Sequence, residues 1–180
     1  CPIEEYDLKS KDPFERALAS SRLIFVPTHP EIQPRVHQEE VKLVVRFLKA
    51  LERVRTNQTV GVITPFRAQV NAIRKALQKE WHAWVQVDTV ERFQGAEKDI
   101  IILSTAVSSA KQLPLIQSLP PRPLRKGETL LDRKLNVAIT RAREHLILLG
   151  VPELLQRAPQ YEALLRYIEK WGIYFQVTPE

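Results

Sequence analysis

Short runs of consecutive apolar residues, separated by stretches with helical periodicity, limit the fold of this 180-residue chain more than any other feature. No run alternates cleanly between polar and apolar residues, as a strand with one solvent-exposed face would. A continuous apolar strand is instead typical of a parallel sheet that helices cover on both sides. The sequence therefore predicts an α/β fold with a mostly parallel central sheet and helices on both faces. The candidate strands are Leu23–Val26, Val60–Ile63, Val85–Val87, Ile100–Leu103 and Leu146–Leu149.

Three of the intervening stretches carry the spacing of an amphipathic helix. Apolar side chains recur every three or four positions in residues 39–55, 70–77 and 161–171. The first stretch has Glu39 near its start and Arg53 near its end, an arrangement of charges that the helix dipole favours. Gly172 follows the third stretch and is predicted to be its C-cap. We expect all three to be helices that pack on the sheet.

Two stretches depart from this order. Residues 1–20 are polar and of mixed charge, without a clear period, so 1–22 is predicted to be a lead-in segment to a domain spanning 23–180. Residues 111–126 combine four prolines with basic side chains and are predicted to form a long loop. A loop of this length either serves a function, here contact with a nucleic-acid backbone, or is a variable surface excursion.

The composition excludes several classes of protein. Hydrophobic residues make up 44% and charged residues 27% of the chain, as in a soluble globular protein, and no stretch is apolar enough to cross a membrane. The single cysteine, Cys1, and four scattered histidines give neither an internal disulfide nor metal-ligand spacing. We expect an intracellular protein, cytoplasmic if bacterial. A net charge of +6 would favour the binding of a polyanion. The absence of methionine suggests that the chain is a piece of a longer polypeptide.

Signatures of self-contained hydrolytic chemistry are absent from the sequence. None of the five glycines belongs to the GxxxxGK[ST] loop that cradles nucleotide phosphates. Asp88 follows an apolar strand, but no acidic neighbour accompanies it as in a magnesium site, so no metal ligand is predicted. No Gly-x-Ser-x-Gly elbow organises a nucleophile. Hydrolysis by this chain alone is therefore not expected.

Polar residues concentrate instead in three segments beside predicted strands, at 64–69, 88–99 and 136–143. In open parallel sheets, ligands bind beyond the carboxyl ends of the strands. The first two segments follow strands and are therefore in position to contact a ligand.

These segments resemble motifs IV, V and VI of superfamily 1 helicases. They read VITPFRAQ at 62–69, VDTVERFQGAEKD at 87–99 and LNVAITRAR at 135–143. The three motifs occur in the expected order with strands between them, and the resemblance runs from about Leu23 to about Gly150. They look like the branch that contains the RNA helicase of nonsense-mediated decay and the nuclease-helicase that processes Okazaki fragments.

The resemblance implies the second of two RecA-like domains, with a three-layer RecA-like fold. ATP and Mg²⁺ would be held mainly by the P-loop and carboxylates of an N-terminal RecA-like domain of the same polypeptide. The expected substrate is single-stranded DNA or RNA, and the branch implies travel from 5′ to 3′. The chain alone would be inactive.

Arg141 resembles the arginine finger of motif VI, a permanent cation whose planar fork meets the charge that develops on the γ-phosphate. If residues 133–143 form one helix, Arg141 and Arg143 flank its core face on opposite sides and do not both reach one phosphate. Arg143 is therefore expected to make a structural ion pair or a nucleic-acid contact.

The remaining site residues follow from motifs IV and V. Glu97 resembles the carboxylate that accepts hydrogen bonds from the ribose, and Gly95 would let the backbone approach the nucleotide. Phe66 resembles an aromatic that stacks on the base, although it could simply be buried. The candidates for the phosphate side of the nucleotide are Arg67 and Gln69. Some relatives have the motif IV arginine directly after the glutamine, where this chain has Val70.

Nucleic acid is expected to cross the domain through contacts with its backbone. Thr64 and Thr89 are the best candidate contacts. Gln94 and Thr89 could link the nucleotide cleft to this surface, or could be ordinary turn and cap residues.

Two other functions stay open. A helicase-like domain that has lost its motor function could serve as a nucleic-acid or protein binding module. A longer protein could also carry a nuclease domain, a question that these residues do not address.

Overall fold

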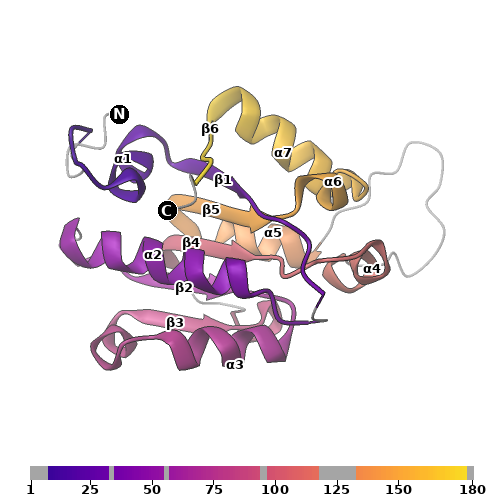
Figure 1. The fold of residues 1–180 in the computed structure, drawn as a ribbon, viewed down its shortest axis with the longest axis horizontal. Helices are drawn as coiled ribbons and strands as arrows, with labels where there is room; N and C mark the ends of the chain where they lie inside the picture. Colours follow the sequence, from indigo (N-terminus) through magenta and orange to yellow (C-terminus); the bar gives the residue numbers. More distant parts are fainter. Residues whose placement is uncertain (1–7, 33–34, 55–56, 94–96, 118–132, 178–180) are drawn as a thin grey trace.

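A six-stranded parallel sheet forms the centre of the computed structural model, which describes residues 8–32, 35–54, 57–93, 97–117 and 133–177 (Figure 1). The strand order is β3-β2-β4-β5-β1-β6, and every neighbouring pair is parallel. This is the predicted α/β fold of the RecA-like kind. The strands are β1 (Leu23–Pro27), β2 (Val60–Ile63), β3 (Val85–Asp88), β4 (Lys98–Ser104), β5 (Ala142–Gly150) and β6 (Ile173–Tyr174).

Helices cover both faces of the sheet. In Figure 1 α2 lies in front of the sheet and α5 behind it. The described α-helices are α1 (Pro13–Ser20), α2 (Gln38–Val54), α3 (Arg67–Ala76), α4 (Leu113–Ile116), α5 (Arg133–Thr140), α6 (Pro152–Leu155) and α7 (Pro159–Trp171). Three short 3₁₀ helices accompany them, η1 (Lys79–Ala83), η2 (Val90–Phe93) and η3 (Ala110–Gln112).

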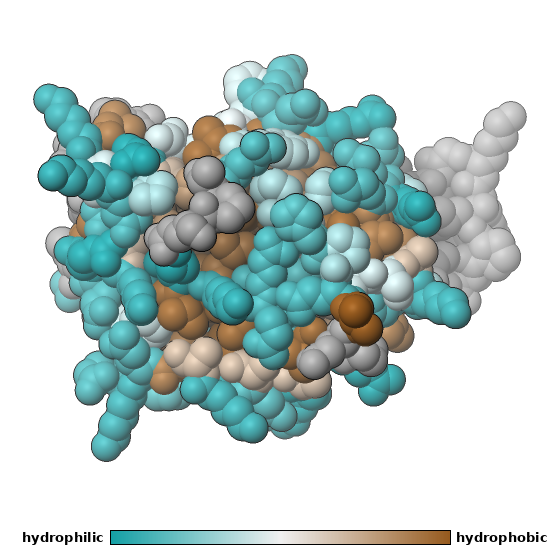
Figure 2. Space-filling view, viewed as in Figure 1, coloured by the Kyte–Doolittle hydropathy of each residue, from teal (hydrophilic) through white to brown (hydrophobic). Residues whose placement is uncertain are grey.

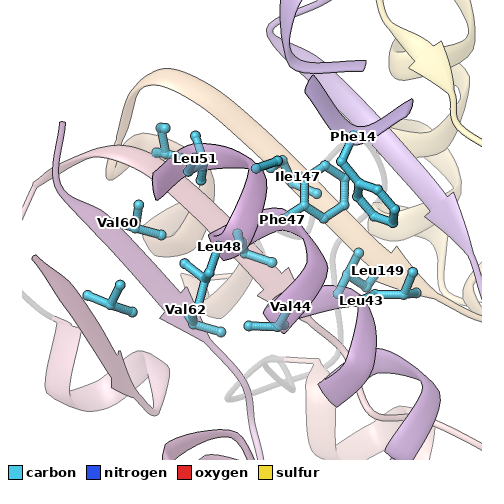
Figure 3. Close-up of a cluster of buried hydrophobic side chains, with 14 of the residues drawn as sticks. Phe14, Leu43, Val44, Phe47, Leu48, Leu51, Val60, Val62, Ile147 and Leu149 are labelled. Carbon is cyan, nitrogen blue, oxygen red and sulfur yellow. The ribbon is translucent and has the colours of Figure 1, made fainter. Parts of the chain in front are cut away.

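Alternate residues of β1, β2, β4 and β5 enter two separate hydrophobic clusters, whereas Val85 and Val87 of β3 enter only the first. Ile147 and Leu149 of β5 pack on the side of α1, α2 and α3, whereas Leu146 and Leu148 pack on the side of α5 and α7. Successive side chains of a strand point to opposite faces, so a run that is apolar throughout must be covered twice. This is the physical reason why the runs of β1, β4 and β5 are apolar at consecutive positions. Figure 3 shows the first cluster, where Phe47 and Leu48 of α2 meet the sheet.

Helix α1 lies within the predicted lead-in segment and was not predicted. Asp12 caps it by accepting a hydrogen bond from the Phe14 amide at 2.8 Å, and Pro13 stands at its first position. The Phe14 ring is fully buried edge-on against Phe47, with ring centroids 4.8 Å apart. This part of the segment is therefore packed on the domain core, while the proposed boundary at residues 22 and 23 stays a prediction.

The C-terminal end of the described chain adds a strand that sequence periodicity does not reveal. Gly172 ends α7 as predicted, and its amide donates to the Ile168 carbonyl at 2.7 Å. A Cβ atom at this position would lie 2.4 Å from the Leu23 carbonyl oxygen. Glycine therefore lets the chain turn closely against β1, and the two residues of β6 then extend the sheet.

The condition of one helix over residues 133–143, considered from the sequence, is not met. Helix α5 ends at Thr140, whose hydroxyl donates back to the Asn136 carbonyl at 2.7 Å. Arg141 occupies a turn, and β5 begins at Ala142. Pairing with β4 competes with helix formation here, because the Lys98 amide donates to the Arg141 carbonyl at 2.9 Å.

The predicted long loop begins with helical turns. Residues 111–117 include the end of η3 and all of α4, with Leu113 and Ile116 buried in the second cluster. The rest of that loop, from residue 118 to 126, lies outside the described residues.

Figure 2 shows mainly hydrophilic side chains on the outer face over α2 and α3. None of the helices in the described ranges is both long and apolar enough to span a membrane.

Candidate functional site

The parallel sheet gives the site two separate edges, one at the amino ends of its strands and one at the carboxyl ends. Glu97 directly precedes β4, and Arg141 directly precedes β5. Thr64, Arg67 and Thr89 follow β2 or β3. Since Val60 pairs with Ile100, Glu97 and Thr64 lie about seven residues apart along the strand direction, roughly 20 Å at about 3.3 Å per residue.

At the amino edge, the structure brings Arg141 beside the motif V segment. Lys98 pairs with Ala142 in the sheet, so the residues that precede them, Glu97 and Arg141, are neighbours. The Nε atom of Arg141 is buried and has no hydrogen-bond partner among the described residues. A buried guanidinium donor without a partner is unusual, which makes this side chain a candidate for binding an anion.

Arg143 and Glu97 form an ion pair at the same edge. The Nε and Nη2 atoms of Arg143 donate to Glu97 Oε2 at 2.9 and 2.8 Å. Hydrogen bonding and the charge of Glu97 raise the pKa of Arg143. Of the two alternatives for Arg143, the structure shows the ion pair, and it places the side chain far from Thr64 and Thr89. The nucleic-acid contact of Arg143 stays a prediction.

At the carboxyl edge, three predicted site residues are covered by protein. Thr64 is fully buried, and its hydroxyl has no hydrogen-bond partner in the described part of the chain. Phe66 is 7% exposed and belongs to the second hydrophobic cluster, as its alternative interpretation expects. Thr89 is also buried, and its amide bonds to the Asp88 carboxylate at 2.9 Å.

Gln69, predicted to contact nucleotide phosphates, is instead a buried structural residue. Its Oε1 accepts from the His37 amide at 2.8 Å, and its Nε2 donates to the His37 carbonyl and to Ser104 Oγ. The side chain is fully buried. The prediction is corrected because both ends of the amide already have protein partners and neither faces solvent.

The same buried network contains Glu40, a residue that the sequence analysis missed. Its Oε2 accepts from Ser104 Oγ at 2.5 Å and from the Ala106 amide at 2.9 Å. Burial raises the pKa of Glu40 to about 8, although these hydrogen bonds oppose the shift. Burial also lowers the pKa of the neighbouring His37. A signal existed, since Glu40 falls on the same helical stripe as Val44 and Leu48.

Asp88 is the centre of an arginine cluster at the carboxyl edge. Its carboxylate lies 3.3 Å from Arg74, 3.6 Å from Arg67 and 4.0 Å from Arg92. No group of three or more His, Cys, Asp or Glu side chains capable of holding a metal ion occurs among the described residues. The charged neighbours of Asp88 within 4.0 Å are therefore arginines, which makes this a cationic rather than an acidic surface.

Two pockets stand near the carboxyl ends of the strands. The smaller, of about 390 Å³, is lined by Arg35, Pro65, Phe66, Arg67, Ala68 and Leu115. The larger, of about 710 Å³, lies beside β1 and α6 and contains no predicted site residue. Gln94 and Gly95, predicted to lie at the nucleotide, are outside the described residues.

Comparison with known proteins identifies related domains. A family model described as "AAA domain" matches residues 16–153. The chain is 37% identical over 139 residues to the 3'-5' exoribonuclease HELZ2 of Homo sapiens. The matched region covers 73% of this chain and 5% of that protein. It is 31% identical over 151 residues to the putative helicase MOV-10 of Gallus gallus, covering 75% of this chain and 15% of that protein.

A third relative is the DNA replication ATP-dependent helicase/nuclease DNA2 of Gallus gallus. It is 33% identical over 121 residues, which cover 67% of this chain and 11% of that protein. The chain thus spans between 5% and 15% of the length of these three relatives. What is similar is one domain of each.

Proposed function

This chain belongs to the AAA domain family, in the C-terminal region of superfamily 1 helicases, and from that membership we propose that it is the second motor domain of an ATP-dependent helicase or translocase. In this proposal the domain supplies the arginine finger and part of the surface that binds single-stranded nucleic acid. Travel from 5′ to 3′ is part of the same proposal and rests on the branch that the motifs resemble.

The observation that carries the proposal is the grouping of Arg141 with Glu97 at one edge of the sheet. These residues come from motifs more than 40 positions apart, and the β4–β5 register makes them neighbours. A nucleotide at this edge would place its ribose near a carboxylate and its γ-phosphate near a guanidinium that has a buried, unpartnered Nε atom. Arg143 holds the Glu97 carboxylate in place, or competes with the ribose for it.

ATP and Mg²⁺ fit this chain only in part. Arg141 and Glu97 could contact the nucleotide, but the described residues provide no carboxylate cluster for Mg²⁺. A P-loop domain of the same polypeptide would hold both. The bound metal would supply charge neutralisation at the phosphates, while Arg141 would add a positive charge from the opposite side of the cleft.

We assign the single strand to the carboxyl edge, which lies roughly 20 Å from the nucleotide edge. Arg67 is exposed there, beside the smaller pocket. The sequence analysis placed Phe66 and Arg67 at the nucleotide, but the length of the strands separates them from Glu97 and Arg141. Thr64 and Thr89 are buried and remain candidate contacts from the motifs alone.

The test uses the whole protein to which this chain belongs. The gene sequence that precedes Cys1 should encode a GxxxxGK[ST] loop, and the whole protein should hydrolyse ATP in the presence of single strands. Arg141→Ala should lower the turnover by about 10³ to 10⁵-fold, or roughly 4–7 kcal/mol in barrier. Arg166→Ala, on the exposed face of α7, is the matched control and should keep the parent rate.

Three outcomes would contradict parts of the proposal. Turnover of the Arg141→Ala protein within about threefold of the parent would remove Arg141 from the finger role. Absence of the P-loop would favour the non-catalytic binding module. Unwinding of partial duplexes with 3′ tails, but not with 5′ tails, would reverse the assigned direction.

A further inference from the structure

We propose that Arg67 and Arg92, organised around Asp88, bind successive phosphates of the single strand at the carboxyl edge. This inference rests on the proposed function and deepens it, because it assigns the strand to particular side chains. Arg67 is the first residue of α3, and Arg92 lies in η2 after β3. Both guanidiniums lie within 4.0 Å of the same oxygen, Asp88 Oδ1, so they are close together beyond the ends of β2 and β3.

The distances show that these two arginines still have donors to offer. Arg67 Nη1 and Arg92 Nε lie 3.6 and 4.0 Å from Asp88 Oδ1, too far for hydrogen bonds. Both side chains are 60% exposed. The carboxylate therefore attracts the guanidiniums without using their N–H groups, and these groups remain able to grip a phosphate in the bidentate way that arginine favours.

Arg74 has a different role in the cluster. Its Nε and Nη2 atoms donate to the Val87 carbonyl at 3.1 and 2.7 Å, and Nη2 also reaches Asp88 Oδ2 at 3.3 Å. These bonds tie α3 to the end of β3 and fix the carboxylate. Three arginines around one carboxylate leave a net charge of about +2 on this small surface, which is what attracts a polyanion.

The surface continues from Arg67 into the smaller pocket. Arg67 lines this pocket of about 390 Å³ together with Arg35, Pro65 and Phe66. Helix α3 begins here without a side-chain cap and without an acidic residue in its first turn, so its N-terminal dipole adds to the attraction. A nucleotide unit next to the Arg67 phosphate would enter this pocket.

A purely structural ion-pair network is the competing explanation. Exposed ion pairs at these distances contribute about 0–1 kcal/mol to stability. In an ion-pair network that stabilises the fold, we expect shorter contacts and more deeply buried side chains. Of the three arginines, Arg74 comes nearest to this, with a 2.7 Å hydrogen bond to the Val87 carbonyl. Asp88 itself would repel a phosphate, so the two explanations predict opposite effects of removing its charge.

The experiment measures the anisotropy of a fluorescein-labelled oligothymidylate or oligouridylate of about 12 nucleotides with the chain. Salt is varied from about 50 to 200 mM. The Arg67→Ala/Arg92→Ala variant should bind about tenfold more weakly at low salt. Its slope of log K against log salt should fall by about 1.4, or about 0.7 for each lost phosphate contact.

Two further variants make the test discriminating. Asp88→Asn should bind about threefold more tightly at low salt, because a repelling charge is gone. Arg157→Ala/Arg166→Ala removes the same number of exposed charges near α6 and α7 and should keep the parent slope. Urea unfolding of every variant checks that it is folded.

The outcomes separate this inference from the proposed function. If the parent binds and both double variants share its slope, the arginine cluster does not bind phosphates, while nucleic-acid binding itself stands. If Asp88→Asn lowers the unfolding free energy and does not tighten binding, the arginine cluster is likewise shown not to bind phosphates. If the parent binds neither probe at any salt concentration, both the cluster and the assigned strand surface are refuted.

Discussion

Replacing the buried Glu40 by glutamine should make the chain more stable at high pH and change the way in which its stability depends on pH. Burial raises the pKa of Glu40 from 4.5 to about 8 in the folded protein. The protonated form is therefore favoured by folding. Its contribution to stability is fully present below about pH 4.5 and is lost as the pH rises toward 8, because the carboxyl must then either ionise while buried or stay protonated at a cost.

The magnitude follows from the difference between the two pKa values. A shift of about 3.5 units at about 1.4 kcal/mol per unit corresponds to about 5 kcal/mol between the two ends of the titration. About 1 kcal/mol of this is already lost at pH 5, so about 4 kcal/mol separates pH 5 from pH 9. This is a large part of the roughly 5–15 kcal/mol by which domains are stable.

Glutamine is the appropriate replacement because it has the same shape and no charge to gain. Its amide oxygen can still accept from Ser104 Oγ and from the Ala106 amide, as the Glu40 carboxyl does. Urea unfolding at pH values from 5 to 9, followed by tryptophan fluorescence, gives the free energies. Trp81 and Trp84 are buried and should report on the loss of the core.

The expected result is a growing difference between the two proteins. The stability of Glu40→Gln relative to the parent should increase by about 4 kcal/mol from pH 5 to pH 9. Titrations of the buried His37 and His145, whose pKa values desolvation lowers, are common to both proteins and largely cancel. Glu39→Gln, the same change on the half-exposed preceding residue, is the control and should follow the parent curve. Parallel curves for the parent and Glu40→Gln would refute the reasoning.

Two substitutions test the packing of the fold by urea unfolding. Phe14→Ala should lower the unfolding free energy by about 3–5 kcal/mol, since the ring is fully buried. The control, Leu8→Ala at an exposed side chain, should change it by less than about 0.5 kcal/mol. Equal effects of the two substitutions would show that α1 is not part of the core. Gly61→Ala should cost about 1–3 kcal/mol because the new Cβ would lie 2.8 Å from both Ile101 Cδ1 and Phe93 Cε1, and an unchanged midpoint would mean that these side chains move aside.

The strands were predictable because their signal is local. A strand buried on both faces needs apolar residues at consecutive positions, and all five predicted runs became neighbours in one sheet. The helices at 38–54, 67–76 and 159–171 were predictable from the 3.6-residue period. Helix α1 and strand β6 were missed because each is short and depends on packing, α1 on Phe47 and β6 on the edge of β1.

The end of α5 shows how tertiary pairing overrides local pattern. The residues from 133 to 143 have a plausible helical face, but the backbone of Arg141 bonds to Lys98 instead. A strand from elsewhere in the chain provided the partner, and the sequence of the segment itself contains no sign of it. The position of Arg141 at the amino edge follows from this pairing.

The sequence by itself determined five of the strands, three of the helices, the parallel α/β class and the three motifs that identify the family, because each depends on residue types at short spacing. Only the tertiary structure decided which motif residues share an edge. It separated Glu97 and Arg141 from Arg67, paired Arg143 with Glu97, and buried Gln69 and Glu40 in one network. The physical reason is that strand register and burial arise from contacts between segments distant in the chain, and these contacts set the distances and electrostatic environments on which binding depends.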